Sequence, residues 1–306
     1  MQVLYAYYKS DERGQINKFE KHLFHSIDKT YELYFLMFLL IIDLSKYAET
    51  RIELAKNKKR PTDEDLQPNT KFINNRFIRQ VAVNNQLNKF IAEKGISWVN
   101  EPELIKNLFT RIADTQYFKQ YMTSDVDTYE WDKKLIVKML SEDILNFEPL
   151  YHALEEQSIF WNDDIDFTIS MVIKTIKAFK QSDAEFAQLM PLFKNEDDMN
   201  FAKTLFRKSI LQKDEHIKII DSFTMNWDIE RIAFMDILIM QIAITELVEF
   251  PSIPVKVTLN EFIEISKYYS TTKSSTFING VLDKIIHKLK EDKKIAKQGR
   301  GLIGEI

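Results

Sequence analysis

The chain has 306 residues, of which 45% are hydrophobic, and it contains no cysteine. This length suits one large domain or two ordinary ones, and the lack of cysteine excludes disulfides and thiolate metal sites and fits a reducing, cytoplasmic location. The formal net charge of −4 is not typical of nucleic-acid-binding proteins, so any RNA site has to be a local basic patch. Only 6 glycines and 7 prolines are present, too few for an all-β chain with many turns.

The N-terminal part of the sequence has a helical pattern. Residues 1–8 read as the tail of a helix, and a long helix is predicted from Ile16 to Asn57. Its apolar run from Leu33 to Ile42 is ten residues long, whereas a membrane helix needs roughly 20, so we expect a buried core helix and no membrane contact. The basic residues 56–60 (KNKKR) fit the solvated end of that helix.

The middle of the chain predicts further helices after a loop at residues 62–70. The first should run from Phe72 to Ala92, with Gly95 as its C-cap. Trp98, Trp131 and Trp161 raise the alternative of base-stacking platforms, but without interleaved Arg and Lys they indicate core packing. The later helices are expected near 102–110, 115–122, 131–145, 150–157 and 165–180.

Two patterns in the sequence resemble chemical sites but do not qualify. Gly299 to Gly304 matches G-x-G-x-x-G, but the expected strand before it and helix after it are missing. His22, His25 and Asp28 share a helical spacing, yet no further ligand cluster supports a metal site. The sequence has no P-loop, G-x-S-x-G or H-E-x-x-H motif. We therefore expect no enzymatic activity, no catalytic residue, no metal and no cofactor.

The C-terminal part is expected to form a separate helical unit after the polar break NEDDMN at residues 195–200. An almost wholly apolar helix from Asp228 to Val248 should be its buried centre. Two further helices then follow within 253–289, joined by a Ser- and Thr-rich turn, with Ser274 or Ser275 as the N-cap of the second one. The residues from 291 to 306 read as a basic, flexible tail.

This C-terminal pattern resembles a known family. The segment VKVTLNEFIEISKYYSTTKSSTFINGVLDKI is similar to the C-terminal signature of the NusB family, and the similarity extends upstream to about Phe201. MQVLYAYY is similar to the end of that family's first helix. The resemblance implies an all-α fold, namely a NusB-like helical bundle with a large additional helical region. We expect residues 1–196 to hold the start of the first helix and a long insertion, 197–290 the NusB-like C-terminal domain, and 291–306 the tail.

The resemblance also implies a function in transcription antitermination. NusB pairs with NusE, a ribosomal small-subunit protein, and together they hold boxA RNA of ribosomal RNA operons on the elongating RNA polymerase. The family's RNA-binding surface matches Tyr5, Lys267, Lys273, Ser274 and Phe277 here. Lys273 departs from the acid common at its position and adds positive charge that faces RNA.

The resemblance further implies that NusE docks on the C-terminal unit. Glu230 and Arg231 are the candidate docking residues, because they open the central helix while remaining at the surface.

Two other functions are weighed against this one. The long insertion favours a protein-binding scaffold of NusB-like fold without RNA activity. Family members carry an arginine-rich stretch before this point, and such a stretch encoded upstream of Met1 would argue for RNA binding instead. Some RNA methyltransferases carry a NusB-like N-terminal domain, but they need a downstream α/β domain. The sequence ends just after the match, so we do not expect a methyltransferase.

Overall fold

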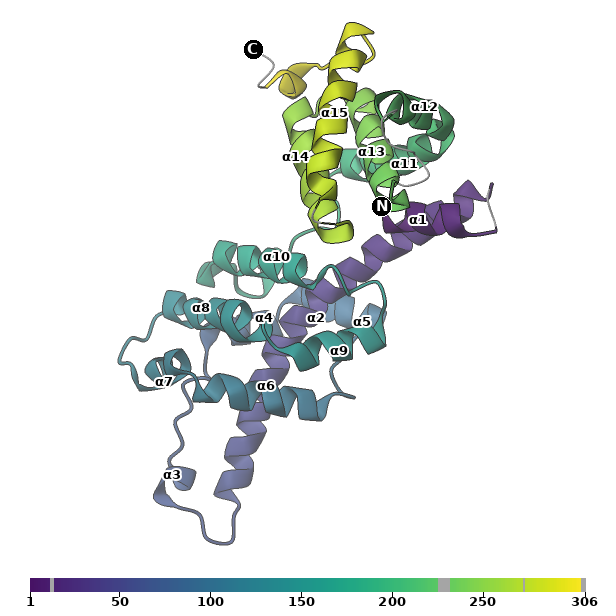
Figure 1. Cartoon of the computed structure of the whole chain (residues 1–306). Coiled ribbons are helices and arrows are strands. Elements are labelled where there is room, and N and C mark those ends of the chain that lie inside the picture. Colours follow the sequence, from purple (N-terminus) through teal and green to yellow (C-terminus); the bar gives the residue numbers. More distant parts are fainter. Residues whose placement is uncertain (12–13, 225–231, 272, 304–306) are drawn as a thin grey trace. The chain divides into compact units, whose positions relative to one another are not determined.

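The computed structural model describes residues 1–11, 14–224, 232–271 and 273–303, and among these residues it contains helices and no strand. The expected all-α fold is therefore confirmed (Figure 1). The chain divides into two compact units, one made of residues 1–24 and 193–306 and the other of residues 25–192. None of the described helices combines the length and apolarity that a membrane crossing needs.

The first unit contains the N-terminal helix and the five C-terminal helices. Its helices are α1 (Gln2–Lys9), the first turns of α2 (Ile16–Lys56), α11 (Glu196–Leu211), α12 (Lys213–Phe223), α13 (Phe234–Glu249), α14 (Val255–Tyr269) and α15 (Ser274–Glu291). Helix α13 is the centre, because residues 238–247 are all buried and it contacts α1, α11, α12, α14 and α15. The predicted central buried helix is confirmed.

The start of the central helix differs from the prediction. The sequence pattern places it at Asp228, but Asp228 lies outside the described residues and the helix begins at Phe234. The carbonyl of Ala233 accepts the first helical bonds, from the N–H groups of Asp236 and Ile237 at 2.9 and 3.3 Å. An apolar pattern that continues through this point contains no cap residue to mark the boundary.

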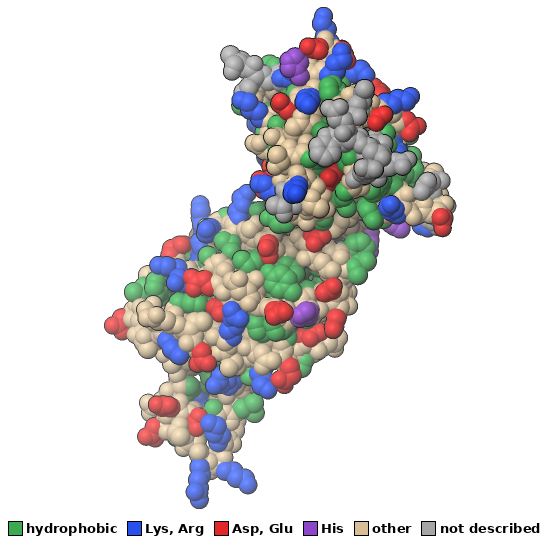
Figure 2. Space-filling model, in the orientation of Figure 1, with side chains coloured by type: hydrophobic (Ala, Val, Ile, Leu, Met, Phe, Trp, Pro, Cys, Tyr) green, Lys and Arg blue, Asp and Glu red, His purple; other side chains and the backbone are tan. Residues whose placement is uncertain are grey.

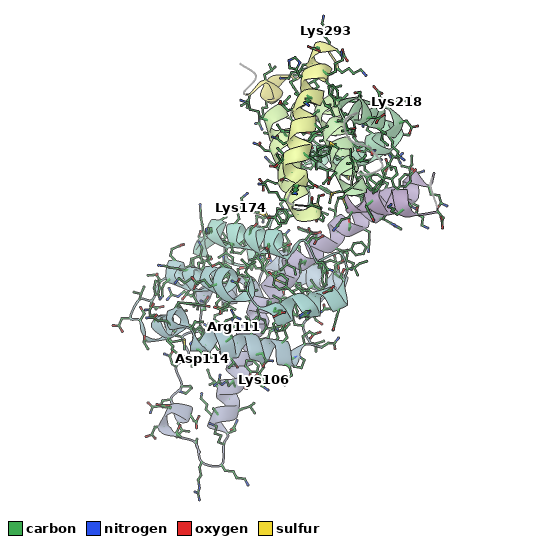
Figure 3. All side chains as sticks on the ribbon, in the orientation of Figure 1. Lys106, Arg111, Asp114, Lys174, Lys218 and Lys293 are labelled. Atoms are coloured by element: carbon green, nitrogen blue, oxygen red, sulfur yellow. The ribbon has the colours of Figure 1, made fainter. Side chains whose placement is uncertain are left out.

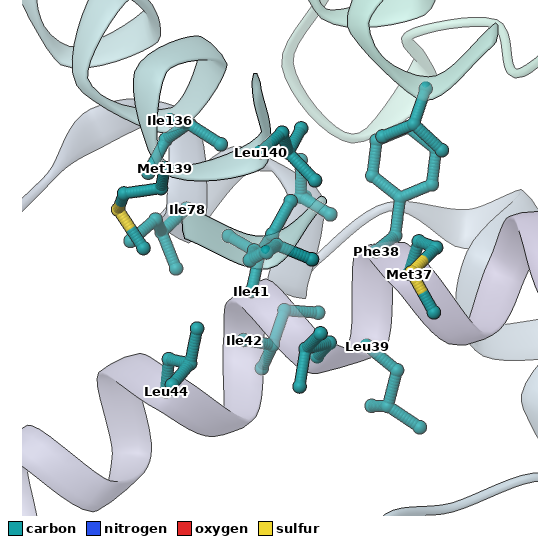
Figure 4. Close-up of a cluster of buried hydrophobic side chains, with 14 of the residues drawn as sticks. Met37, Phe38, Leu39, Ile41, Ile42, Leu44, Ile78, Ile136, Met139 and Leu140 are labelled. Atoms are coloured by element: carbon teal, nitrogen blue, oxygen red, sulfur yellow. The ribbon is translucent and has the colours of Figure 1, made fainter. Parts of the chain in front are cut away.

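The second unit forms from the insertion and has its own core. Besides most of α2, its helices are α3 (Asp63–Leu66), α4 (Arg76–Ala82), α5 (Asn85–Lys94), α6 (Pro102–Asp114), α7 (Gln116–Thr123), α8 (Tyr129–Lys138), a π-helical segment Met139–Ile144, α9 (Glu148–Gln157), α10 (Ile165–Ala178) and a 3₁₀ helix Gln181–Phe186. Figure 4 shows the apolar run of α2 packed against residues of α4, α8 and the π-helical segment. The predicted burial of Leu33–Ile42 is confirmed.

The helix predicted from Phe72 to Ala92 is interrupted in the structure. It is divided into α4 and α5, and each begins at an asparagine cap. The Oδ1 of Asn75 accepts from the N–H of Ile78 at 3.0 Å, and the Oδ1 of Asn84 accepts from the N–H of Leu87 at 2.9 Å. Because Asn84 also donates to the carbonyl of Ala187 at 2.7 Å, long-range bonds hold the break. The predicted C-cap at Gly95 is confirmed by its φ of 65°.

Two of the three tryptophans lie in the core, as predicted. Trp98 and Trp161 are buried and donate to the carbonyls of Leu36 and Lys29 at 3.0 and 2.7 Å. Trp131 is only half-buried, and the ammonium of Lys134 lies 5.1 Å from its ring centroid. Figure 2 shows basic and acidic side chains intermixed on the visible face of this unit, without a field of one sign.

The residues after α15 lie against the turn between α13 and α14. The Nζ of Lys297 donates to the carbonyl of Phe250 at 3.0 Å, and the N–H of Gln298 donates to the carbonyl of Pro251 at 2.9 Å. A Cβ at Gly301 would lie 1.9 Å from the same Pro251 oxygen, so only glycine fits this close approach.

Candidate nucleic-acid interface

Helix α1 presents an aromatic surface next to a lysine. The side chain of Tyr5 is 39% exposed, and its ring meets the edge of the Phe234 ring with centroids 5.6 Å apart. The Nζ of Lys9 lies 4.5 Å from the Phe234 centroid and 5.9 Å from that of Tyr5. Aromatic faces with an adjacent cation favour base stacking together with phosphate contact.

The other side chains of α1 fix the position of Tyr5. Leu4, Tyr7 and Tyr8 are buried in the core of the first unit. The hydroxyl of Tyr8 donates to the carbonyl of Ser209 at 3.2 Å and accepts from the Nε2 of Gln241 at 2.8 Å. Burial raises the pKa of Tyr8 to about 12, so this hydroxyl stays neutral and the bonds hold at physiological pH.

The turn between α14 and α15 and the adjoining helix ends carry the remaining predicted site residues, with different exposures. Lys267 and Lys273 are exposed; Lys267 donates to the carboxylate of Glu264, while Lys273 has no ion pair among the described residues. Phe277 is half-buried and packs on the core. Ser274 is buried, and its hydroxyl lies 2.8 Å from that of Thr271. Of these four residues, the lysines are therefore the most accessible.

The predicted serine cap of α15 is wrong. Lys273 occupies the N-cap position without a hydrogen bond from its own side chain to the helix, and Ser274 is the first residue of the helix. The pairing of the Ser274 hydroxyl with Thr271 gives the side chain a partner within the turn, in competition with the capping geometry.

The beginning of α13 connects the two parts of this surface. Phe234 contacts Tyr5 of α1, and two residues further on the buried carboxylate of Asp236 accepts a hydrogen bond from the hydroxyl of Ser270 in the turn. Figure 1 shows the start of α13 between α1 and the α14–α15 turn, at one end of this unit. The start of α13 thus contacts both α1 and the turn, the two segments that hold the residues assigned by resemblance.

Three residues of this surface are not identified by sequence reasoning. Lys9 and Phe234 carry no motif of their own; Lys9 lies one helical turn after Tyr5 on α1, whereas only the fold brings Phe234 beside Tyr5. Tyr268 precedes the turn and is 83% exposed, which makes it the most accessible aromatic side chain here. Tyr268 could have been identified from the sequence as an aromatic residue just outside the apolar stripe of a predicted helix.

The docking and metal-site candidates from the sequence are the last residues to be placed. Glu230 and Arg231 lie outside the described residues. The rings of His22 and His25 pack against those of Phe19 and Phe160, with centroids 5.3 and 5.2 Å apart. Within the described ranges, no group of three His, Cys, Asp or Glu residues has a metal-binding arrangement.

Comparison with known proteins gives consistent matches. A family profile described as the NusB family matches residues 170–287. The chain is 40% identical to the transcription antitermination protein NusB of Salinibacter ruber over 139 residues, which cover 44% of this chain and 87% of that protein. It is 41% identical over 106 residues to the NusB of Chloroherpeton thalassium, covering 33% of this chain and 50% of that protein.

A third relative is the NusB of Finegoldia magna, 35% identical over 109 residues that cover 36% of this chain and 78% of that protein. None of the solved structures matches the chain. The match covers most of the Salinibacter protein but less than half of this chain. The difference corresponds to the additional helices of the second unit. The chain therefore belongs to the NusB family and is an enlarged member of it.

Proposed function

We propose that this chain is an antitermination factor that binds single-stranded boxA-type RNA of ribosomal RNA operons together with NusE, on the elongating RNA polymerase in the cytoplasm. The observation that carries the proposal is that the start of α13 contacts both α1 and the α14–α15 turn. This arrangement combines the exposed ring of Tyr5 with Phe234 and the ammonium groups of Lys9 and Lys273. Binding is the mechanism, and no chemical step or cofactor is required.

The arrangement suits single-stranded RNA better than a duplex. Stacking on aromatic side chains requires unpaired bases, whereas lysine ammonium groups contact the phosphates between them. The hydrogen bond from Ser270 to Asp236 fixes the turn on the central helix, so the lysines at the turn and the rings on α1 keep a constant spacing. This preorganisation lowers the entropic cost of binding.

The test is a titration of the full chain with a boxA-type RNA and with a scrambled RNA of equal length, each with and without NusE. We expect preferential binding of boxA and a higher affinity when NusE is present. Binding of NusE without any preference for boxA RNA would contradict the proposal and favour the protein-binding scaffold.

Replacement of Phe277 by leucine should weaken RNA binding by about 1–3 kcal/mol if one base stacks on its ring. Leucine retains much of the apolar volume that packs on the core but removes the aromatic plane, which separates stacking from packing. The measurement is the dissociation constant at several salt concentrations, and the salt slope should stay constant.

Phe201→Leu is the matched control for this substitution. Phe201 is also half-buried and packs on Phe250 with ring centroids 4.6 Å apart, beyond the opposite end of α13 from Phe234. Equal affinities of the two variants would show that Phe277 only packs.

Replacement of Lys273 by alanine should lower the affinity and reduce the salt dependence. One phosphate contact to a single strand contributes about 0.7 to the slope of log K against log salt concentration. Lys267→Ala should change the slope less, because its ammonium already pairs with Glu264. Lys218 lies on α12, away from the turn (Figure 3), so Lys218→Ala should leave the slope unchanged. A slope that falls equally in all three variants would refute the placement of RNA at the turn.

We also propose that NusE docks beside the central helix through Glu230 and Arg231. The support is their place in the sequence, directly before the described start of α13, in the part of the family that pairs with NusE.

A further inference from the structure

The second unit contains an apolar cavity that the proposed function does not use. Its volume is about 350 Å³, at the lower end of the range for small-molecule sites, roughly 300–1,000 Å³. The floor and walls are apolar and partly aromatic, and come from the last turns of α2, from α6 and α7, and from the segment before α4. They include Ala55, Phe72, Phe109, Ala113, Phe118 and Met122.

The outer wall of the cavity is a strap at residues 57–70, which is bonded to itself at one end and to α7 at the other. At one end the Nζ of Lys58 donates to both oxygens of Asp65, at 2.9 and 3.1 Å, and Asp65 also accepts from the N–H of Thr62 at 3.0 Å. At the other end the Nδ2 of Asn69 donates to the carbonyl of Met122 at 2.7 Å. The internal bonds hold the local shape of the strap, and the bond of Asn69 attaches its C-terminal end to α7.

The charged groups at the rim indicate the sign of the ligand. Arg51 is the only cation among the lining residues, and it makes no hydrogen bond or ion pair with the described parts of the chain. Of the two lining carboxylates, Asp65 is already bound by Lys58 and Thr62, whereas Glu64 is exposed on the strap. A guanidinium without a partner beside an apolar cavity is suited to an anionic head group on an apolar body.

We propose that this cavity binds a small organic anion with an apolar body, its carboxylate or sulfonate paired with Arg51. The inference is independent of RNA binding, because every lining residue lies in the unit formed by residues 25–192. The apolar body lies against the cluster that Phe72, Phe109 and Phe118 form by contacting one another, and the volume excludes a helix or an extended lipid as the occupant.

The test uses two fluorescent probes with the same ring system and the full chain at neutral pH. One is 8-anilinonaphthalene-1-sulfonate, and the other is its uncharged counterpart, N-phenyl-1-naphthylamine. We expect each to bind saturably at one site. Arg51→Gln should weaken the sulfonate about tenfold, the factor that corresponds to 1.4 kcal/mol, and leave the neutral probe unchanged. Glu64→Gln should act in the opposite direction and tighten the sulfonate.

Two further variants locate the site. Ala113→Leu fills the cavity from α6 and should abolish binding of both probes; Ala55→Leu fills it from α2 and serves if the first variant does not fold. Arg300→Gln, in the other unit, is the matched charge control and should change nothing. Probe binding that survives both leucine variants, or a loss that is equal for the two probes in Arg51→Gln, would overturn the proposal. If neither probe binds and the leucine variants abolish self-association, the cavity belongs to an interface with a second copy.

Discussion

Replacement of Phe38 by alanine is expected to lower the free energy of unfolding of the second unit by about 3–5 kcal/mol. Phe38 lies on α2 with no exposed surface, in the cluster of Figure 4, and its ring meets that of Tyr34 with centroids 5.2 Å apart. The cost has two parts, the lost burial of the ring and the cavity left among neighbours that cannot fully relax. Urea denaturation followed by tryptophan fluorescence measures it, because Trp98 and Trp161 lie in the same core.

The matched control for this prediction is the same substitution at the surface. Phe186→Ala removes a ring that is 66% exposed and should change the stability by less than about 0.5 kcal/mol. A loss below about 1 kcal/mol at Phe38 would mean that this core is loosely packed and that the insertion is not a cooperative unit.

The stability of this insertion could be predicted from its sequence only in part. The uninterrupted apolar run of α2 and the richness in aromatic residues predict a packed helical region. The division into α4 and α5 could not be predicted, because it depends on Asn84 reaching the carbonyl of Ala187, more than a hundred residues later. Helical periodicity carries no information about such a bond.

The candidate site shows the same division between local and long-range information. Tyr5, Lys273 and Phe277 could be assigned by resemblance to a family, which records the residue types along the chain. The surface itself depends on Phe234 and Asp236, whose contacts with Tyr5 and Ser270 join segments far apart in sequence. The burial of Ser274, which decides whether its hydroxyl is accessible, also appears only in the fold.

Lowering the pH from 7.5 to 5 is expected to destabilise the first unit by about 2 kcal/mol through one buried histidine, His216. His216 lies on α12 and is only 3% exposed, and its Nδ1 lies 3.3 Å from the Oγ1 of Thr245 on the central helix. Burial is the main cause that lowers the pKa of His216 from 6.5 to about 4, and Lys294 also acts in this direction. The carboxylates of Glu215 and Glu249 oppose the shift without reversing it.

The direction of the effect follows from proton uptake. Between about pH 6.5 and pH 4 the unfolded chain binds a proton at this histidine that the folded chain does not bind, so stability is fully present above pH 6.5 and is lost as the pH falls. His216→Gln removes this titration while keeping a polar side chain near Thr245, and should reduce the dependence of the unfolding free energy on pH between 7.5 and 5; burial also lowers the pKa of the Met1 amine to about 6, so part of the dependence remains. His152→Gln, at a histidine whose side chain is 68% exposed, should retain the full dependence. Urea denaturation at half-unit intervals of pH measures all three proteins, and identical pH profiles for the unmodified chain and His216→Gln would show that this imidazole is already charged in the fold.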